Sequence, residues 1–160
     1  MKHLRDVSNA ESLLNGEVEL FQKVDGANLN LKRVGGKIKY YGREWRNEID
    51  LIKRTTMDFY EEGIEYLESQ DLSFVKEGDF IEFEYFGSRV TPVIKVTRKP
   101  KNNLIVLRSS FGNEEVVAKK LNVDPNPMIF KGHLNDKQKE IILSGKFTKE
   151  EIPYFNPNYN

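Results

Sequence analysis

The chain has 160 residues, of which 38% are hydrophobic, 31% charged and 11% aromatic, a composition typical of a folded globular protein with one hydrophobic core. No apolar run approaches the roughly 18 residues of a membrane span, so we expect a cytoplasmic protein without a membrane segment. The 25 basic and 25 acidic residues cancel, which excludes an overall attraction to nucleic acid, and the lack of cysteine leaves lysine, arginine and carboxylates as the chemical groups.

Patterns along the first third of the chain predict strands. Alternating apolar and polar residues indicate a strand over Glu17–Asp25 that places Lys23 and Asp25 on the same face. Two more strands, Ala27–Val34 and Lys37–Arg43, flank a Gly-Gly pair of the kind that a two-residue hairpin turn requires.

A two-residue turn fixes the register of this hairpin. Val34 then faces Lys37, and the pairing continues until Asn28 faces Arg43. The face that includes Asn28 is polar, whereas the opposite face is apolar and forms the core side. The register therefore predicts an amide and a guanidinium beside the end of the strand that contains Lys23.

The rest of the chain alternates helices and strands irregularly, which indicates an α+β fold with mainly antiparallel sheets and flanking helices. Apolar residues at helical spacing predict a helix that starts after Asn47 and ends near Ser69. The other expected elements are a strand over Asp79–Phe86, a strand over Asn103–Ser110, a helix over Glu114–Leu121 and a strand over Pro127–Lys131. Capping boxes predict three further short helices, with the pairs Ser8 and Glu11, Asn135 and Gln138, and Thr148 and Glu151.

One basic run lies between two of these strands. It contains Lys95, Arg98, Lys99 and Lys101 and no acidic residue. A solvated loop is the simpler interpretation, and contact with a nucleic-acid backbone is the alternative.

The Lys-x-Asp-Gly run that begins at Lys23 has two interpretations. It is either a strand that ends in an Asp-Gly turn or part of a reactive site. A lysine amine is a nucleophile only when deprotonated, and a neighbouring cation such as Arg43 favours that state. The arginine fork also suits a nucleotide phosphate, and phosphoryl-type transfer usually requires Mg²⁺.

Three motifs in order resemble those of the ATP-dependent RNA ligases of the RNA ligase 2 branch, within the covalent nucleotidyltransferase superfamily. They are the run from Gln22 to Asn28, the Tyr-Gly-Arg run that ends at Arg43, and the run from Asp79 to Gly87. The resemblance implies that Lys23 becomes linked to AMP. It also implies a nucleotide-binding set, namely Gln22 at the adenine, Asp25, Gly26 and Asn28 in the lysine motif, Arg43 at the nucleotide and Glu84 at the ribose hydroxyls.

The same resemblance implies an adenylation domain of the ATP-grasp-like ligase type over residues 1–152, incomplete at its C-terminal side, with a tail over residues 153–160. Leu107 lies nearest to the position where the family has an aromatic against the adenine. No Glu-Gly motif follows Gly87, and the later Lys-x-Lys, Lys137 to Lys139, falls in a predicted helix.

Two functions follow from the resemblance. The first is an RNA ligase-like module that binds ATP with Mg²⁺ or Mn²⁺, transfers AMP to Lys23 and serves the sealing of nucleic-acid ends in RNA repair, with RNA favoured over DNA. A second polypeptide would then supply the missing motifs. The alternative is a catalytically degenerate ligase fold that serves as a nucleotide-binding, nucleic-acid-binding or assembly protein. An unrelated α+β domain with a chance Lys-x-Asp-Gly is the third interpretation.

Overall fold

A computed structural model describes residues 14–52, 54–91 and 98–144. Of these, residues 23–126 belong to one compact unit, and residues 14–22 with 127–144 belong to another. The capping boxes that begin at Ser8 and Thr148, the basic residue Lys95 and the tail 153–160 lie outside the described residues. No helix in the described part of the chain is long and apolar enough to cross a membrane.

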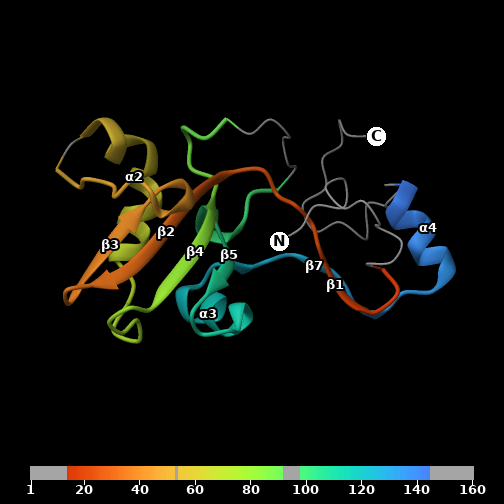
Figure 1. Cartoon of the computed structure of the whole chain (residues 1–160). Helices are drawn as coiled ribbons and strands as arrows, with labels where there is room; N and C mark the ends of the chain where they lie inside the picture. The colour runs from red at the N-terminus through yellow and green to blue at the C-terminus, as the bar shows by residue number, and fades with distance from the viewer. Residues whose placement is uncertain (1–13, 53, 92–97, 145–160) are drawn as a thin grey trace. The chain divides into compact units, whose positions relative to one another are not determined.

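The larger unit is built on a five-stranded sheet in the order β3-β2-β4-β5-β6, of which β3, β2, β4 and β5 can be followed in Figure 1. The strands are β2 (Ala27–Val34), β3 (Lys37–Tyr41), β4 (Phe80–Tyr85), β5 (Leu104–Ser109) and β6 (Asp124–Pro125). Neighbouring strands are antiparallel except β5 and β6, which are parallel. The expected mixture of helices with mainly antiparallel strands is therefore confirmed, while β6 is an element that the sequence patterns did not predict.

The β2–β3 hairpin has the predicted two-residue turn. Gly35 and Gly36 have φ angles of 60° and 75°, a left-handed conformation that glycine adopts without strain. The predicted register is confirmed from the turn as far as the pair Asn30 and Tyr41. The further pairing of Asn28 with Arg43 is wrong, because β3 ends at Tyr41 and the chain leaves the sheet in a short 3-10 helix, η2 (Arg43–Trp45).

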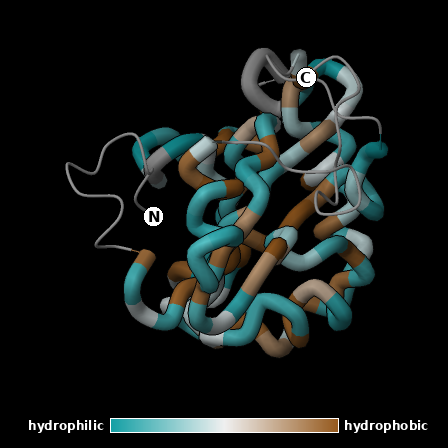
Figure 2. The backbone as a smooth tube through the Cα atoms, turned by 90° about the vertical axis from the view of Figure 1, so that its right-hand side faces the viewer, coloured by the Kyte–Doolittle hydropathy of each residue, from teal (hydrophilic) through white to brown (hydrophobic). Residues whose placement is uncertain are grey.

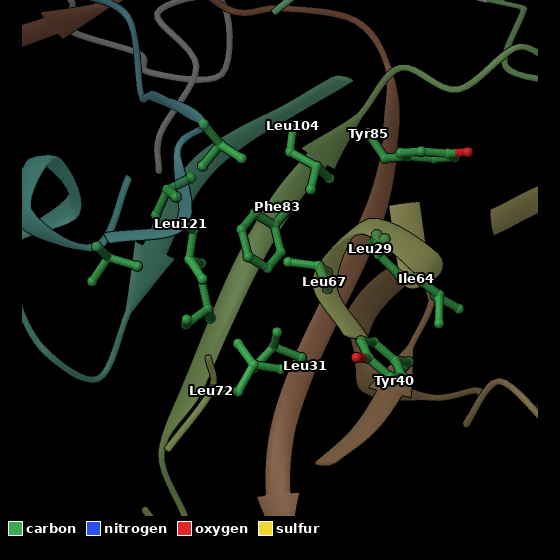
Figure 3. Close-up of a cluster of buried hydrophobic side chains, with 14 of the residues drawn as sticks. Leu29, Leu31, Tyr40, Ile64, Leu67, Leu72, Phe83, Tyr85, Leu104 and Leu121 are labelled. Atoms are coloured by element: carbon green, nitrogen blue, oxygen red, sulfur yellow. The ribbon is translucent and has the colours of Figure 1, made fainter. Parts of the chain in front are cut away.

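Helices α2 (Arg54–Glu68) and α3 (Glu114–Leu121) pack on one face of this sheet and form a continuous core with it. Figure 3 shows Leu67 of α2 close to the sheet residues Leu29 and Phe83. Gly63 makes the close approach of α2 possible, because a Cβ there would lie 2.8 Å from the Tyr85 ring and 2.9 Å from Leu29 Cδ2. Figure 2 shows the alternation of hydrophobic and hydrophilic stretches along the chain that produces such a one-sided core.

The bounds of the helices test the helix predictions. Helix α3 has the predicted bounds, and the Asn113 side chain caps it by accepting from the Val116 N–H at 3.2 Å. Helix α2 starts later than expected after Asn47. The Ile52 N–H donates to Asp50 Oδ1 in a local turn before the helix. Ile52 is 91% exposed, so it is not part of the apolar face of the helix.

The smaller unit contains β1 (Glu17–Phe21), which pairs antiparallel with β7 (Met128–His133), and helix α4 (Asp136–Ser144). Its core cluster of buried side chains is Leu14, Leu134 and Ile142. The predicted capping box is confirmed, since the Asn135 N–H donates to Gln138 Oε1 at 3.0 Å and the Gln138 N–H donates to Asn135 Oδ1 at 2.8 Å.

Strand β1 is shorter than predicted and ends before Lys23. The last backbone bond is from Gln22 N–H to the Pro127 carbonyl at 2.9 Å. Proline has no N–H, so it cannot return a hydrogen bond to continue the ladder. The prediction that Lys23 and Asp25 share a strand face is therefore wrong, and both lie in the connection from β1 to β2.

Candidate nucleotide-binding site

Four of the predicted site residues, Lys23, Asp25, Gly26 and Asn28, interact with Glu84 on β4. Strands β2 and β4 pair so that Asn28 lies opposite Glu84. The Gly26 N–H donates to Glu84 Oε1 at 2.8 Å, and Asn28 Nδ2 donates to Glu84 Oε2 at 3.3 Å. One carboxylate thus holds the segment that follows Lys23 against the sheet.

The glycines of two motifs are required by close packing around Tyr85. A Cβ on Gly26 would lie 2.6 Å from the Tyr85 carbonyl oxygen, and a Cβ on Gly87 would lie 1.8 Å from the Tyr85 hydroxyl. Neither position leaves room for a larger residue without a shift of backbone or of a buried ring. The Lys-x-Asp-Gly glycine therefore allows the chain to approach β4 closely enough for its N–H to reach Glu84.

Burial, a hydrogen bond and two neighbouring charges shift the pKa of Glu84 in different directions. Burial raises the pKa of the Glu84 carboxyl above its ordinary value, while the hydrogen bond from Gly26 lowers it. The negative charge of Asp25 raises the same pKa and the positive charge of Lys23 lowers it, so both side chains lie within electrostatic range of Glu84. Val24 between them is buried, whereas Lys23 is exposed. The segment therefore buries Val24 and leaves the Lys23 side chain exposed to solution.

Arg43 lies in a loop that leaves the sheet next to this group of residues. The Gly42 N–H donates to the Asn47 carbonyl at 3.0 Å, which closes the loop, and Asn30 Nδ2 donates to the Gly42 carbonyl at 3.0 Å. Asn30 is the next residue after Asn28 on the same face of β2. The loop of Arg43 and the segment of Lys23 are thus attached to neighbouring positions of one strand.

Glu82 is a residue whose surroundings the sequence patterns did not reveal. Its side chain is only 19% exposed, and Arg108 contacts both of its oxygens, at 2.8 and 2.9 Å. Trp45 Nε1 donates to Oε1 at 2.8 Å. Burial alone would raise the pKa of Glu82, but the hydrogen bonds from Arg108 and Trp45 and the charge of Arg108 outweigh it and lower the pKa. Strand alternation placed Glu82 on the face of Glu84, yet nothing in the sequence identified its partners.

The remaining predicted residues belong to other elements of the chain. Gln22 belongs to the smaller unit, where its N–H bonds to the Pro127 carbonyl. Arg98, Lys99 and Lys101 are exposed, as either interpretation of the basic run requires. Leu107 is the extra residue of a β-bulge, because Glu82 pairs with Arg108 while Phe83 pairs with Val106.

No group of three or more histidine, aspartate or glutamate side chains in the described ranges could hold a metal ion. The described side chains thus do not form a metal cage of their own. Mg²⁺ commonly binds through substrate phosphates, water and one or two carboxylates, so a metal that enters with a nucleotide fits these residues better than a resident one.

No protein-family model matches the sequence, and no curated protein sequence matches it. Two solved structures match its fold: a lysine-to-alanine mutant of Naegleria gruberi RNA ligase with ATP and Mn, and a lysine-to-methionine mutant of the same ligase with AMP and Mn. The TM-scores are 0.56 and 0.54, and the identities are 16% and 15% over 83% and 84% of this chain. The chain spans 42% of the length of either structure. These matches show an RNA ligase-like fold.

Proposed function

We propose that this chain is an RNA ligase-like nucleotidyltransferase module that binds ATP and transfers AMP to Lys23, in the manner of the RNA ligase 2 branch. The observation that supports this most directly is the arrangement around Glu84. Its carboxylate accepts from Gly26 and Asn28 while the charges of Lys23 and Asp25 act on it. Residues from two separate motifs of the sequence thus meet at one position.

The proposed reaction is the displacement of pyrophosphate by the Lys23 amine. The Nζ–phosphorus bond forms at the α-phosphate, the bond from that phosphorus to the bridging oxygen breaks, and the amine proton passes to solvent or a nearby base. Arg43 would bind a phosphate with its planar fork, and Glu84 would accept hydrogen bonds from the ribose hydroxyls. Mg²⁺ or Mn²⁺, bound mainly through phosphate oxygens, would neutralise charge on the phosphates.

The AMP on Lys23 would then be passed to a nucleic-acid end, with RNA favoured over DNA. Arg98, Lys99 and Lys101 are exposed and would contact a nucleic-acid backbone, a role that we also propose for Lys95. A second polypeptide would contribute the Glu-Gly and Lys-x-Lys groups of the family, in line with the 42% of the ligase length that this chain covers. On this proposal residues 1–152 form a partial adenylation domain in the cytoplasm, followed by a tail over residues 153–160.

One observation favours the alternative of a ligase fold that binds nucleotide without transferring it. The Lys-x-Lys run that ends at Lys139 lies in α4, where residues two apart point in different directions. Lys139 Nζ donates to Asn15 Oδ1 at 3.0 Å within the smaller unit. This lysine therefore already has a structural partner.

The test is intact-mass analysis of the full chain after incubation with ATP and Mg²⁺, and again with Mn²⁺. We expect a covalent AMP adduct in the wild type and in Lys32→Ala, a matched lysine control from β2, and none in Lys23→Ala. Nucleotide binding without any adduct would favour the non-catalytic alternative. Neither binding nor an adduct, with and without candidate partner chains, would contradict both proposals.

A further inference from the structure

The loop that contains Arg43 is held to the sheet on both sides of that residue. Before Arg43, the Gly42 carbonyl accepts a hydrogen bond from Asn30 Nδ2 at 3.0 Å. After Arg43, Trp45 donates its indole N–H to Glu82 Oε1 at 2.8 Å. The sheet residue that donates is Asn30 of β2, and the one that accepts is Glu82 of β4. These two residues face each other directly across the two strands.

Trp45 adopts a backbone conformation that requires such support. Its φ is 61°, in the left-handed region, where the backbone of a bulky residue is strained. Its ring lies 5.3 Å from the Tyr41 ring and 5.7 Å, edge to face, from the Phe80 ring. Aromatic pairs and a hydrogen bond to a charged group both stabilise a side chain, so these contacts offset the strain.

Glu82 is held in position for this contact by Arg108. The guanidinium donates from Nε to Oε2 at 2.9 Å and from a terminal nitrogen to Oε1 at 2.8 Å, the paired geometry that orients a carboxylate most firmly. Trp45 then bonds to the oxygen that already receives one of these donors. Glu82 therefore interacts with protein groups through both oxygens, and one of these oxygens accepts from both Arg108 and Trp45.

Two successive facing pairs of β2 and β4 thus hold the two segments that the proposed function requires. Asn28 and Glu84 hold the segment of Lys23, and the pair Asn30 and Glu82 holds the loop of Arg43. Two residues along a strand span about 6.8 Å, so the two points of attachment are close enough for one nucleotide to contact both segments.

We propose that Asn30 and Glu82 are positioning residues that fix Arg43 for the nucleotide phosphates, with Trp45 as the side chain that connects Glu82 to the Arg43 loop. This inference rests on the proposed function for its catalytic part, because Arg43 is assigned to the nucleotide there. The role differs from that of Glu84, which is proposed to contact the ribose itself.

The chain offers a direct probe of this arrangement, because Trp45 is the single tryptophan among its 160 residues. Quenching of intrinsic fluorescence by acrylamide therefore reports the exposure of the Arg43 loop alone. In Glu82→Leu the indole N–H loses its acceptor, and we expect the quenching constant to rise by about twofold or more as the loop opens locally. The rate of AMP adduct formation should fall by at least about tenfold, and the ATP concentration for half-maximal rate should rise, because Arg43 is no longer held in place.

Three further variants make the test specific. Asn30→Ala removes the other attachment and should change both readouts in the same direction, which preserves the test if Glu82→Leu does not fold. Glu19→Leu breaks an ion pair of the smaller unit, from Lys131 Nζ to Glu19 Oε1 at 2.9 Å, and should change neither readout. Arg43→Lys should slow adduct formation without changing the quenching of Trp45.

The two readouts separate the inference from the proposed function. Unchanged quenching in folded Glu82→Leu and Asn30→Ala would overturn the attachment, whatever the chemistry of the chain. Increased quenching with an unchanged rate of adduct formation would overturn the positioning role. A wild type that forms no adduct would contradict the proposed function, while the quenching series would still decide whether Glu82 and Asn30 hold the Arg43 loop.

Discussion

At the scale of single residues, Glu82 and Glu84 show how one strand face gives two carboxylates opposite properties. Glu84 is mainly affected by burial, which raises its pKa, whereas the guanidinium of Arg108 and the indole of Trp45 lower the pKa of Glu82. Both side chains come from β4 and are two residues apart. Their neighbours, and not their positions in the motif, therefore decide whether the pKa of each carboxyl is raised or lowered.

The raised pKa of Glu84 gives a prediction about stability. Unfolded Glu84 ionises near the ordinary value of about 4.5, whereas the folded protein keeps the proton to higher pH. Between these two values the unfolded state loses its proton first, so the contribution of Glu84 to the free energy of unfolding decreases as pH rises and then stays low.

Glu84→Gln should remove this decrease in the free energy of unfolding with rising pH. Gln keeps an acceptor for the Gly26 N–H but has no charge, so the variant should gain stability relative to the wild type as pH rises above the ordinary glutamate pKa, while its ATP binding weakens. Urea unfolding of both proteins at a series of pH values measures the difference. A difference that does not change with pH would contradict the prediction.

At the scale of elements, the approach of α2 to the sheet depends on Gly63. Helix propensity alone favours alanine over glycine by about 1 kcal/mol at an interior position of a helix. The added Cβ would lie 2.8 Å from Tyr85 and 2.9 Å from Leu29, and overpacking of a core costs about 1–3 kcal/mol. The packing cost is the larger of the two, so the helix and the sheet would separate slightly.

We therefore predict that Gly63→Ala lowers the free energy of unfolding by about 1 kcal/mol, measured by urea denaturation. The matched control is Glu65→Ala on the exposed side of α2, which should change stability by no more than about 0.5 kcal/mol. A more stable Gly63→Ala protein would show that helix propensity exceeds the packing cost at this position.

At the scale of the whole molecule, the described residues form two units with different amounts of core. The larger unit packs α2 and α3 on one face of its sheet around an extensive core, whereas the smaller has β1, β7 and α4 and three residues in its buried cluster. A two-stranded sheet is at best marginally stable without further packing. The smaller unit should therefore open more often than the larger one.

Hydrogen exchange monitored by NMR or mass spectrometry measures this difference. We expect amides in the central strands β2 and β4 to exchange at least about tenfold more slowly than those in β1 and β7. Equal protection across both sheets would indicate that the two units unfold together. A candidate partner chain that slows exchange in β1 and β7 selectively would support the proposal that a second polypeptide completes the domain.

The sequence by itself determined the features that depend on local periodicity and on single residue types. The Gly-Gly turn fixed the β2–β3 register from Val34 to Asn30, and the capping box at Asn135 fixed the start of α4, because both depend on residues within a few positions of each other. The sequence motifs predicted Gly26, Asn28 and Glu84 as members of one set, and these three residues are in contact in the structure. Their roles toward a nucleotide stay predictions.

Only the tertiary structure decided where strands end and which side chains meet. Pro127, more than one hundred positions away in sequence, ends the pairing of β1 before Lys23, and the chain leaves β3 at Tyr41 before Arg43 can face Asn28. The partners of Glu82 are likewise distant in sequence, so no local pattern could reveal them. Periodicity assigns a residue to a face of a strand. The neighbours of that residue depend on how strands and loops from distant parts of the sequence pack. The contacts of Asn30 and Glu82 with the Arg43 loop are of this kind.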